Sequence, residues 1–410
     1  MFPNGKIFEE EIPMKKFAAL LLAVVMLMGM MTFASAEEPM IAMITDYGDI
    51  TDQSFNQTTW EAVVKFGNEN DVEYKYFKPA TNDTAGRVAM VERAIDEGYN
   101  VLVMPGYAFG GTIAEISGEY PEVKIIALDV AKGDLLEGAV ALKGEAYDYN
   151  PDNWNLNDYV YMDNVYCAIY QEELCGYMAG YAAVKLGYTK LGFLGGMAVP
   201  AVIRYGYGFV QGCDAAAKEL NINVEVKYVY GNQFFGDADI TAYMDNWYQN
   251  GTEVVFACGG GIYTSAVDAA KKVEGAKVIG VDVDQAAIIT AYAAGSTDAE
   301  ELAKWEKLTV TSAMKGLEPA TIDALTDVVI NGKWEDYAGK IVTLGLVSED
   351  PALNYVQIAG STQFEDGKFT AEDYKTLVKG MLDGTIIVSA DIAAEPAVTN
   401  TTVEYLGNIK

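Results

Sequence analysis

The sequence predicts an α/β protein made of two successive halves, each built around a parallel β-sheet. From residue 41 onward, short runs rich in Val and Ile alternate with stretches that have helical periodicity. Such βα repeats are typical of parallel sheets that helices cover on both faces. At 410 residues, the chain is also too long for one ordinary core, so two lobes are expected.

The first half contains strand and helix signals in regular alternation. Predicted strands are 41–45, 72–77, 101–105 and 123–130, and predicted helices are 54–68, 85–97 and 110–120. Residues 132–164 then break the rhythm with acidic and aromatic residues. We interpret this stretch as a long surface excursion near a crossing between the lobes.

The alternation restarts in the second half. Predicted helices are 171–186, 201–220, 239–249, 263–273 and 285–294, and predicted strands are 190–194, 224–230, 253–258 and 277–282. Residues 308–334 predict one more strand and helix, and the apolar runs IVTLGLV and TIIVS within 342–389 could return to either lobe. Several crossings between two lobes are typical of proteins that close on a ligand about a hinge.

The N-terminal segment has the pattern of a secretory signal. A charged start at Met14 precedes the almost wholly apolar residues 17–33, and the small-residue motif ASA ends at Ala36. We therefore predict a signal peptide over residues 1–36, with Met14 as an alternative start, and an exported protein on the outer side of the cytoplasmic membrane. An uncleaved N-terminal anchor is the alternative. No Cys follows to carry a lipid anchor, and no later stretch of about 20 apolar residues could span a bilayer.

Composition excludes several classes of function. A formal net charge of −31 leaves no basic surface for nucleic acid and favours a neutral or cationic small ligand. The chain has no His, which removes Ser-His-Asp and Cys-His catalysis and His-ligated zinc. The four cysteines are few for an exported chain, and we expect buried free thiols. They are Cys167, Cys175, Cys213 and Cys258.

The segment after the first strand combines several groups that can hold a ligand. The run IAMIT ends in a polar loop with Asp46 and Asp52, and a helix opens at Ser54 with Phe55 and Asn56 in its first turn. Ligands of open parallel sheets bind where strand carboxyl ends meet helix N-termini. No His, Cys or Lys stands in this loop for covalent chemistry, so the segment favours binding over catalysis.

Similar residues follow other strands. Asp129 closes VKIIALD, Asp282 closes KVIGVD, and Gly260 lies in the glycine run after VVFAC. Phe234 and Phe235 follow the strand 224–230, and an aromatic pair facing a cleft can hold a flat ring. Neither G-x-G-x-x-G nor a P-loop motif occurs, so a nucleotide-phosphate fold is poorly supported.

The motifs and their order resemble the basic membrane protein, or PnrA-like, family of ABC transporter substrate-binding proteins. The resemblance rests on TDYGDITDQSFNQTTWEAVVKFG, VMPGYAF, KIIALD, LGFLGGMAVPAVIRYGYGFVQG, VVFACGGG, VIGVDVDQ and LTVTSAMK. It implies a type I periplasmic-binding-protein fold, with two doubly wound parallel-sheet lobes joined by a multi-strand hinge. It further implies capture of a purine nucleoside (guanosine, inosine or adenosine) for an ABC permease and its ATPase, without a cofactor, a metal or catalysis.

The resemblance also assigns roles around the purine base. Phe55 would stack on one face of the purine, and either Phe234 or Phe235 would stack on the other. Asn56 and Asp129 would bind the edge of the base.

The remaining implied contacts concern the ribose. Asp282, Lys315 and the backbone near Gly260 would hold its hydroxyl groups, while Asp46 and Ser54 would belong to the loop and helix start beside it. For Lys315, an ordinary surface lysine at a helix start is the alternative.

The bounds of the two lobes and the identity of the ligand are the two remaining predictions. The predicted first lobe is 37–165 plus 309–340, and the second is 166–308 plus 341–410. The same fold could instead bind a sugar or an autoinducer. A less favoured alternative is a nucleoside-cleaving enzyme that uses Asp46, Asp52 and Asp129 around a metal.

Overall fold

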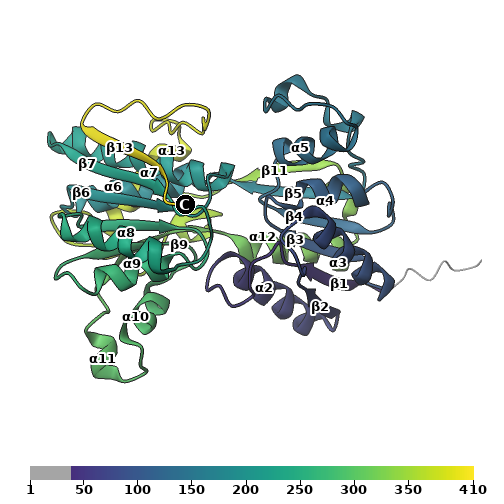
Figure 1. The fold of residues 1–410 in the computed structure, drawn as a ribbon, viewed down its shortest axis with the longest axis horizontal. Coiled ribbons are helices and arrows are strands. Elements are labelled where there is room, and N and C mark those ends of the chain that lie inside the picture. Colours follow the sequence, from purple (N-terminus) through teal and green to yellow (C-terminus); the bar gives the residue numbers. More distant parts are fainter. Residues whose placement is uncertain (1–37) are drawn as a thin grey trace, which may run out of the picture. The chain divides into compact units, whose positions relative to one another are not determined.

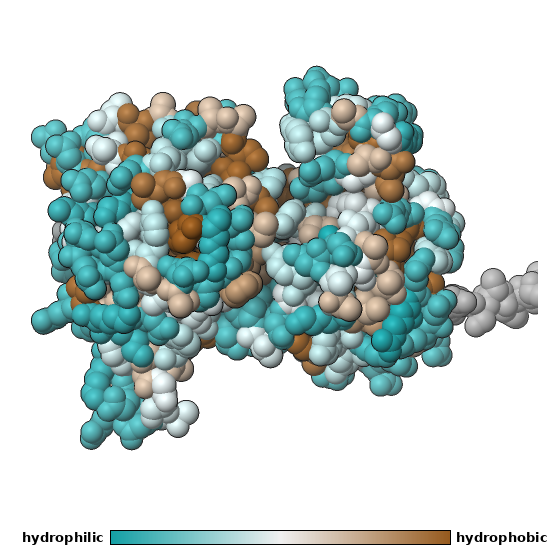
Figure 2. All heavy atoms as spheres, in the orientation of Figure 1, coloured by the Kyte–Doolittle hydropathy of each residue, from teal (hydrophilic) through white to brown (hydrophobic). Residues whose placement is uncertain are grey.

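The computed structural model describes residues 38–410, and the predicted signal peptide lies outside the described residues. Within the unit Met40–Lys410, strands form two sheets, each with helices packed on its faces (Figure 1). The face of the molecule in Figure 2 is mostly hydrophilic, with apolar residues in small separate areas. No helix within residues 38–410 is long and apolar enough to cross a membrane.

The first sheet has six parallel strands in the order β11-β5-β4-β3-β1-β2. Its strands are β1 (Met40–Ile44), β2 (Glu73–Phe77), β3 (Val101–Pro105), β4 (Lys124–Leu128), β5 (Val165–Tyr170) and β11 (Lys340–Leu344). Helices α2 (Phe55–Asn70) and α12 (Leu317–Leu325) pack together, and α3 (Thr84–Asp96), α4 (Phe109–Ile116) and α5 (Lys132–Leu142) form a second group. We call this sheet and its helices the first lobe.

Alternation along β1 explains why both faces of this sheet are covered. Ile41 and Met43 belong to one buried cluster with Phe66 of α2, whereas Ala42 and Ile44 belong to another on the α3–α4 side. All four strand residues are fully buried. Successive side chains of a strand point to opposite faces, so an uninterrupted apolar strand needs helices on both.

The second sheet has the order β12-β10-β9-β8-β6-β7-β13, and only the β10–β12 pair is antiparallel. Its strands are β6 (Lys190–Gly195), β7 (Val224–Tyr230), β8 (Val254–Cys258), β9 (Lys277–Asp282), β10 (Thr309–Lys315), β12 (Val356–Ile358) and β13 (Thr401–Asn408). Its helices are α6 (Glu172–Lys185), α7 (Pro200–Leu220), α8 (Ala238–Gln249), α9 (Tyr263–Ala270), α10 (Ala286–Ala294), α11 (Ala299–Ala303) and α13 (Ala371–Leu382). We call this part the second lobe.

Helices α6 and α7 pack at very close range through glycines. A Cβ atom on Gly176 would overlap the backbone of Tyr205, and one on Gly208 would overlap the backbone of Glu173. This close packing sets the first turn of α6 beside the second and third turns of α7, where the pocket residue Arg204 lies.

The chain passes between the lobes three times, and the three crossings lie side by side. They follow β5, β10 and β11. The backbone of Gln171 donates to Leu344 at 3.0 Å, and the backbone of Gly316 donates to Tyr355 at 2.7 Å. Tyr355 in turn donates to Gly345 at 3.0 Å, so hydrogen bonds connect neighbouring crossings.

The strand pairing differs from the predicted lobe boundaries at three strands. β5 and β11 lie in the first sheet, and β10 lies in the second. Each crossing therefore comes after its strand, whereas the prediction placed the change of lobe before it. Hydrophobic alternation identifies a strand but carries no information about the sheet it joins.

Other differences concern the irregular regions. The expected surface excursion begins with the helix α5, which packs on α4, because Leu135 and Ala139 supply a buried face at helical spacing. Only the later part, with short 3-10 turns at Pro151–Asn153 and Leu156–Asp158, lacks longer elements. The run TIIVS forms no strand, whereas the run IVTLGLV contains β11 except for the first residue of that strand. As predicted, the four cysteines are buried free thiols.

Candidate ligand-binding site

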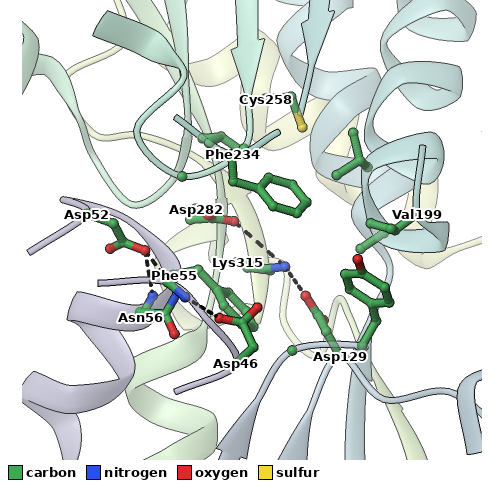
Figure 3. Close-up of a pocket in the computed structure, with 18 of the residues that line it drawn as sticks. Asp46, Asp52, Phe55, Asn56, Asp129, Val199, Phe234, Cys258, Asp282 and Lys315 are labelled. Atoms are coloured by element: carbon green, nitrogen blue, oxygen red, sulfur yellow. Dashed lines mark hydrogen bonds and ion pairs between the residues drawn. The ribbon is translucent and has the colours of Figure 1, made fainter. Parts of the chain in front are cut away.

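A pocket of about 370 Å³ lies at the carboxyl ends of strands from both sheets (Figure 3). This volume is in the range of small-molecule sites. Of the predicted site residues, all but Ser54 line the pocket. They are Asp46, Phe55, Asn56, Asp129, Phe234, Phe235, Gly260, Asp282 and Lys315.

Asp52 organises the helix that carries Phe55 and Asn56. Its carboxylate accepts hydrogen bonds from the backbone N–H of Ser54 at 2.9 Å, of Asn56 at 3.0 Å and of Gln57 at 3.0 Å. A carboxylate at this position satisfies N–H groups that have no partner inside the helix. Asp52 thus fixes the first turn of α2, from which Phe55 and Asn56 reach the pocket wall.

Asp46 is buried in the loop after β1. Its Oδ1 accepts from the backbone N–H of Tyr47 at 2.6 Å and of Gly48 at 2.8 Å. Burial raises the pKa of Asp46, while these hydrogen bonds and the charge of Arg87 oppose the rise. The carboxylate therefore holds its own loop in shape at the pocket edge.

Lys315 is the central charge of the pocket. It ends β10, directly before a crossing, and only 6% of the residue is exposed. Its ammonium pairs with Asp129 and lies 3.7 Å from Asp282 Oδ1 (Figure 3). It also lies 3.7 Å from Glu172 Oε1. Burial alone would lower the pKa of Lys315, but the three carboxylates together raise it. The alternative of a surface lysine at a helix start is therefore wrong.

Asp129 and Asp282 occupy matching positions in the two lobes. They follow β4 and end β9, and both have left-handed backbones, with φ of 58° and 65°. Asp and Asn tolerate this conformation better than most residues, and such strain clusters at functional sites. The Oγ of Ser54 donates to Asp282 Oδ2 at 2.5 Å, so Ser54 orients a pocket carboxylate from the opposite lobe.

The structure distinguishes the two adjacent phenylalanines. Phe234 extends into the pocket (Figure 3), and a Cβ atom on Gly259 would come within 2.8 Å of its ring. Gly259 also has a φ of 140°, which glycine adopts without strain. Phe235 is 57% exposed at the pocket edge. The glycines after β8 thus give the Phe234 ring its space.

Tyr47 and Tyr107 line the pocket although they were not predicted to, and both contact Met197 of the second lobe. The hydroxyl of Tyr47 lies 3.4 Å and that of Tyr107 lies 3.8 Å from the sulfur of Met197, and the Tyr47 ring centroid is 6.4 Å from that of Phe234. Tyr107 follows β3 and Met197 follows β6, so their positions after strands were a usable signal. These contacts join the two lobes across the pocket.

Arg204 and Glu172 form a buried ion pair beside Lys315. Arg204 Nε donates to Glu172 Oε2 at 2.6 Å, and Glu172 is fully buried. Glu172 begins α6 just after a crossing, and Arg204 lies in the first turns of α7. No sequence signal identified this pair, because it depends on the close packing of the two helices.

The carboxylates of the alternative metal site have other partners. Asp52 caps α2, Asp46 holds its loop, and Asp129 pairs with Lys315. Across residues 38–410, no group of three or more His, Cys, Asp or Glu side chains could hold a metal ion.

The free energy of unfolding is expected to depend on pH in an unusual way, because three carboxyl groups with raised pKa values are buried. Burial is the main cause that raises the pKa of Asp129, and it raises the pKa of Asp134 and of Glu173 to about 7. The unfolded chain releases these protons near pH 4. Between about pH 4 and pH 7 the folded state therefore holds more protons, and the free energy of unfolding is expected to fall as the pH rises.

Thermal unfolding of the ligand-free chain, followed by circular dichroism, checks this expectation. The midpoint should be higher near pH 5 than near pH 8, and Asp134→Asn should reduce the difference. A midpoint that rises toward pH 8 would contradict the assignment.

Comparison with known sequences identifies the group to which this fold and pocket belong. A sequence model described as ABC transporter substrate-binding protein PnrA-like matches residues 40–349. The chain belongs to this family. The expected family is thereby confirmed, and the PnrA-like match ends before β12, α13 and β13.

Curated relatives of this PnrA-like protein have modest identity. The ABC transporter nucleoside-binding protein BmpA of Lactococcus lactis subsp. cremoris is 27% identical over 60% of this chain and 64% of its own length. The CD4+ T-cell-stimulating antigen of Listeria monocytogenes is 27% identical over 71% and 74%. Basic membrane protein B of Borreliella afzelii is 25% identical over 75% and 78%. The match thus spans under two thirds of the Lactococcus relative.

Solved structures confirm the fold class. An ABC transporter solute-binding protein from Aeropyrum pernix K1 matches with a TM-score of 0.59 at 18% identity, covering 85% of this chain and 87% of its own. Another from Conexibacter woesei matches with a TM-score of 0.59 at 17% identity, covering 86% and 99%. The PnrA-like chain therefore has the type I periplasmic-binding-protein fold, with two parallel-sheet lobes.

Proposed function

We propose that this protein captures a purine nucleoside between its lobes and delivers it to an ABC permease with its ATPase. One observation carries the proposal: Phe55 of the first lobe and Phe234 of the second line the same pocket. A flat ring between two aromatic side chains gains stacking from both faces. The nucleoside-binding relative from Lactococcus lactis supports the same class of ligand.

The polar groups suit an uncharged, hydroxyl-rich partner. Lys315, Asp129 and Asp282 already balance much of one another's charge, so the pocket needs no ionic ligand. Ribose hydroxyls can donate to the carboxylates and accept from the ammonium. Asn56 supplies an amide whose Oδ1 is buried without a partner among the described residues, and we assign it to the edge of the base.

Delivery requires a place outside the cytoplasm. Substrate-binding proteins of ABC importers work on the outer side of the membrane, and the proposed export of residues 37–410 after signal cleavage fits that site of action. In this function the protein catalyses no reaction. The closed lobes around the ligand form the surface that the permease binds.

Isothermal titration calorimetry of the chain, refolded to remove bound ligand, tests the proposal with inosine, guanosine, adenosine and ribose. We expect one nucleoside per chain and much weaker binding of ribose, which lacks the stacked base. A Phe55→Ala variant should weaken nucleoside binding with little effect on ribose. The absence of a heat of binding with all three nucleosides would overturn the proposal. Tight binding of ribose would indicate that the ligand is a sugar.

A further inference from the structure

Arg204 lines the pocket in a fixed orientation. It lies in the first turns of α7, and its Nε donates to Glu172 Oε2 at 2.6 Å. Glu172 is fully buried, and only 13% of the Arg204 side chain is exposed. A guanidinium held through Nε keeps its two Nη groups as a planar fork at the other end.

That fork has no partner within the described residues. Arg204 makes one side-chain hydrogen bond there, through Nε to Glu172. Some polar side-chain atoms, such as Arg87 Nε, are fully buried without a partner, but the Nη atoms of Arg204 are not among them. The Nη atoms therefore lack a partner within residues 38–410 and remain accessible. The Nη groups of Arg204 are therefore open to the pocket and present unpaired donors to whatever binds there.

A fork of two donors selects two neighbouring acceptors. On a 6-oxopurine, O6 and N7 lie side by side and accept an arginine bidentately, which is the commonest specific contact of arginine with guanine in DNA. On adenine, the position beside N7 carries an amino group, which is a donor. The same fork that pairs with inosine or guanosine would thus face a donor in adenosine.

We propose that Arg204 binds the O6 and N7 edge of the base, so that this pocket selects 6-oxopurine nucleosides over adenosine. The inference rests on the proposed function, because it requires a purine in the pocket. Glu172 acts through Arg204 as a positioning residue that aims the fork. The expected preference for inosine over adenosine is about 5- to 150-fold, which corresponds to 1–3 kcal/mol for a bidentate pair.

The first test varies the ligand and leaves the protein unchanged. Calorimetry compares inosine with adenosine, with purine riboside, which lacks O6, and with 7-deazainosine, which lacks N7. Each change should weaken binding at least several-fold relative to inosine. Equal affinity for inosine and 7-deazainosine, or for inosine and adenosine, would overturn the assignment while leaving nucleoside capture intact. No binding of any nucleoside would overturn both proposals.

The second test changes the fork and keeps its charge. Arg204→Lys retains a cation beside Glu172 but replaces the planar fork with a single ammonium. The ratio of adenosine to inosine dissociation constants should fall toward one, whereas a purely structural role would weaken both ligands equally. The Arg204→Met, Glu172→Gln double variant removes both charges of the pair and should give the same loss of preference. A ratio unchanged in both variants would contradict the proposal.

Discussion

Replacing Lys315 with Met is expected to abolish nucleoside binding and to lower the free energy of unfolding by about 3–5 kcal/mol. The ammonium is the shared partner of Asp129, Asp282 and Glu172, and all four groups are buried. Methionine fills a similar volume but leaves the carboxylates facing one another without their cation. The pocket then loses both its donor and the charge balance that keeps its walls together.

Chemical denaturation and calorimetry measure the two effects separately. Lys65→Met is the matched control, because Lys65 pairs with Glu318 at the surface with both side chains about half exposed. Such exposed pairs contribute about 0–1 kcal/mol. The destabilisation by Lys315→Met should shrink as the pH falls, because burial raises the pKa of Asp129 and its protonation removes the charge that Lys315 pairs with. A Lys315→Met variant as stable as the control would refute the central role of the ammonium.

Replacing Phe234 with Ala is expected to weaken nucleoside binding by about 5- to 150-fold, with a much smaller effect for Phe235→Ala. Stacking of a base on one aromatic face contributes about 1–3 kcal/mol. Phe234 extends over Gly259 into the pocket, whereas Phe235 is 57% exposed at its edge. The adjacent pair thus provides a control that differs by one position in the chain.

Titration of both variants with the same nucleoside decides between the rings. Thermal unfolding without ligand should show that both variants remain folded. A larger loss of affinity in Phe235→Ala would mean that the loop turns over when ligand binds, and the assignment of the stacking ring would be wrong.

Much of the fold could be predicted because its signals are local. The predicted strands 224–230 and 277–282 coincide with β7 and β9, and the pocket residues after β1, β4 and β9 stand at strand ends. The carboxyl ends of parallel strands meet at one edge of a sheet, so position along the chain indicated position in space. This argument brought Asp46, Asp129 and Asp282 to one pocket.

The features that the sequence did not predict depend on distant contacts. β13 joins β7 from far along the chain, and β10 joins the second sheet although α12 packs in the first lobe. Arg204 meets Glu172 only because glycines let α6 and α7 approach closely. The hydrophobic periodicity of a short segment carries no information about contacts between distant segments. Lys315 was predicted only through the resemblance to a known family.

The three adjacent crossings have a mechanical consequence. Rotation of one lobe against the other would take place about the crossings, which follow strands at one edge of each sheet. Lys315 lies at that axis, whereas the Phe234 ring lies over Gly259, which follows β8, two strands away or about 10 Å at the usual spacing. For the same rotation, an atom near the axis hardly moves, while one far from it travels in proportion to its lever arm. The ribose end of the ligand would therefore contact Lys315, which hardly moves. The ring of Phe234 would move toward the base as the lobes close.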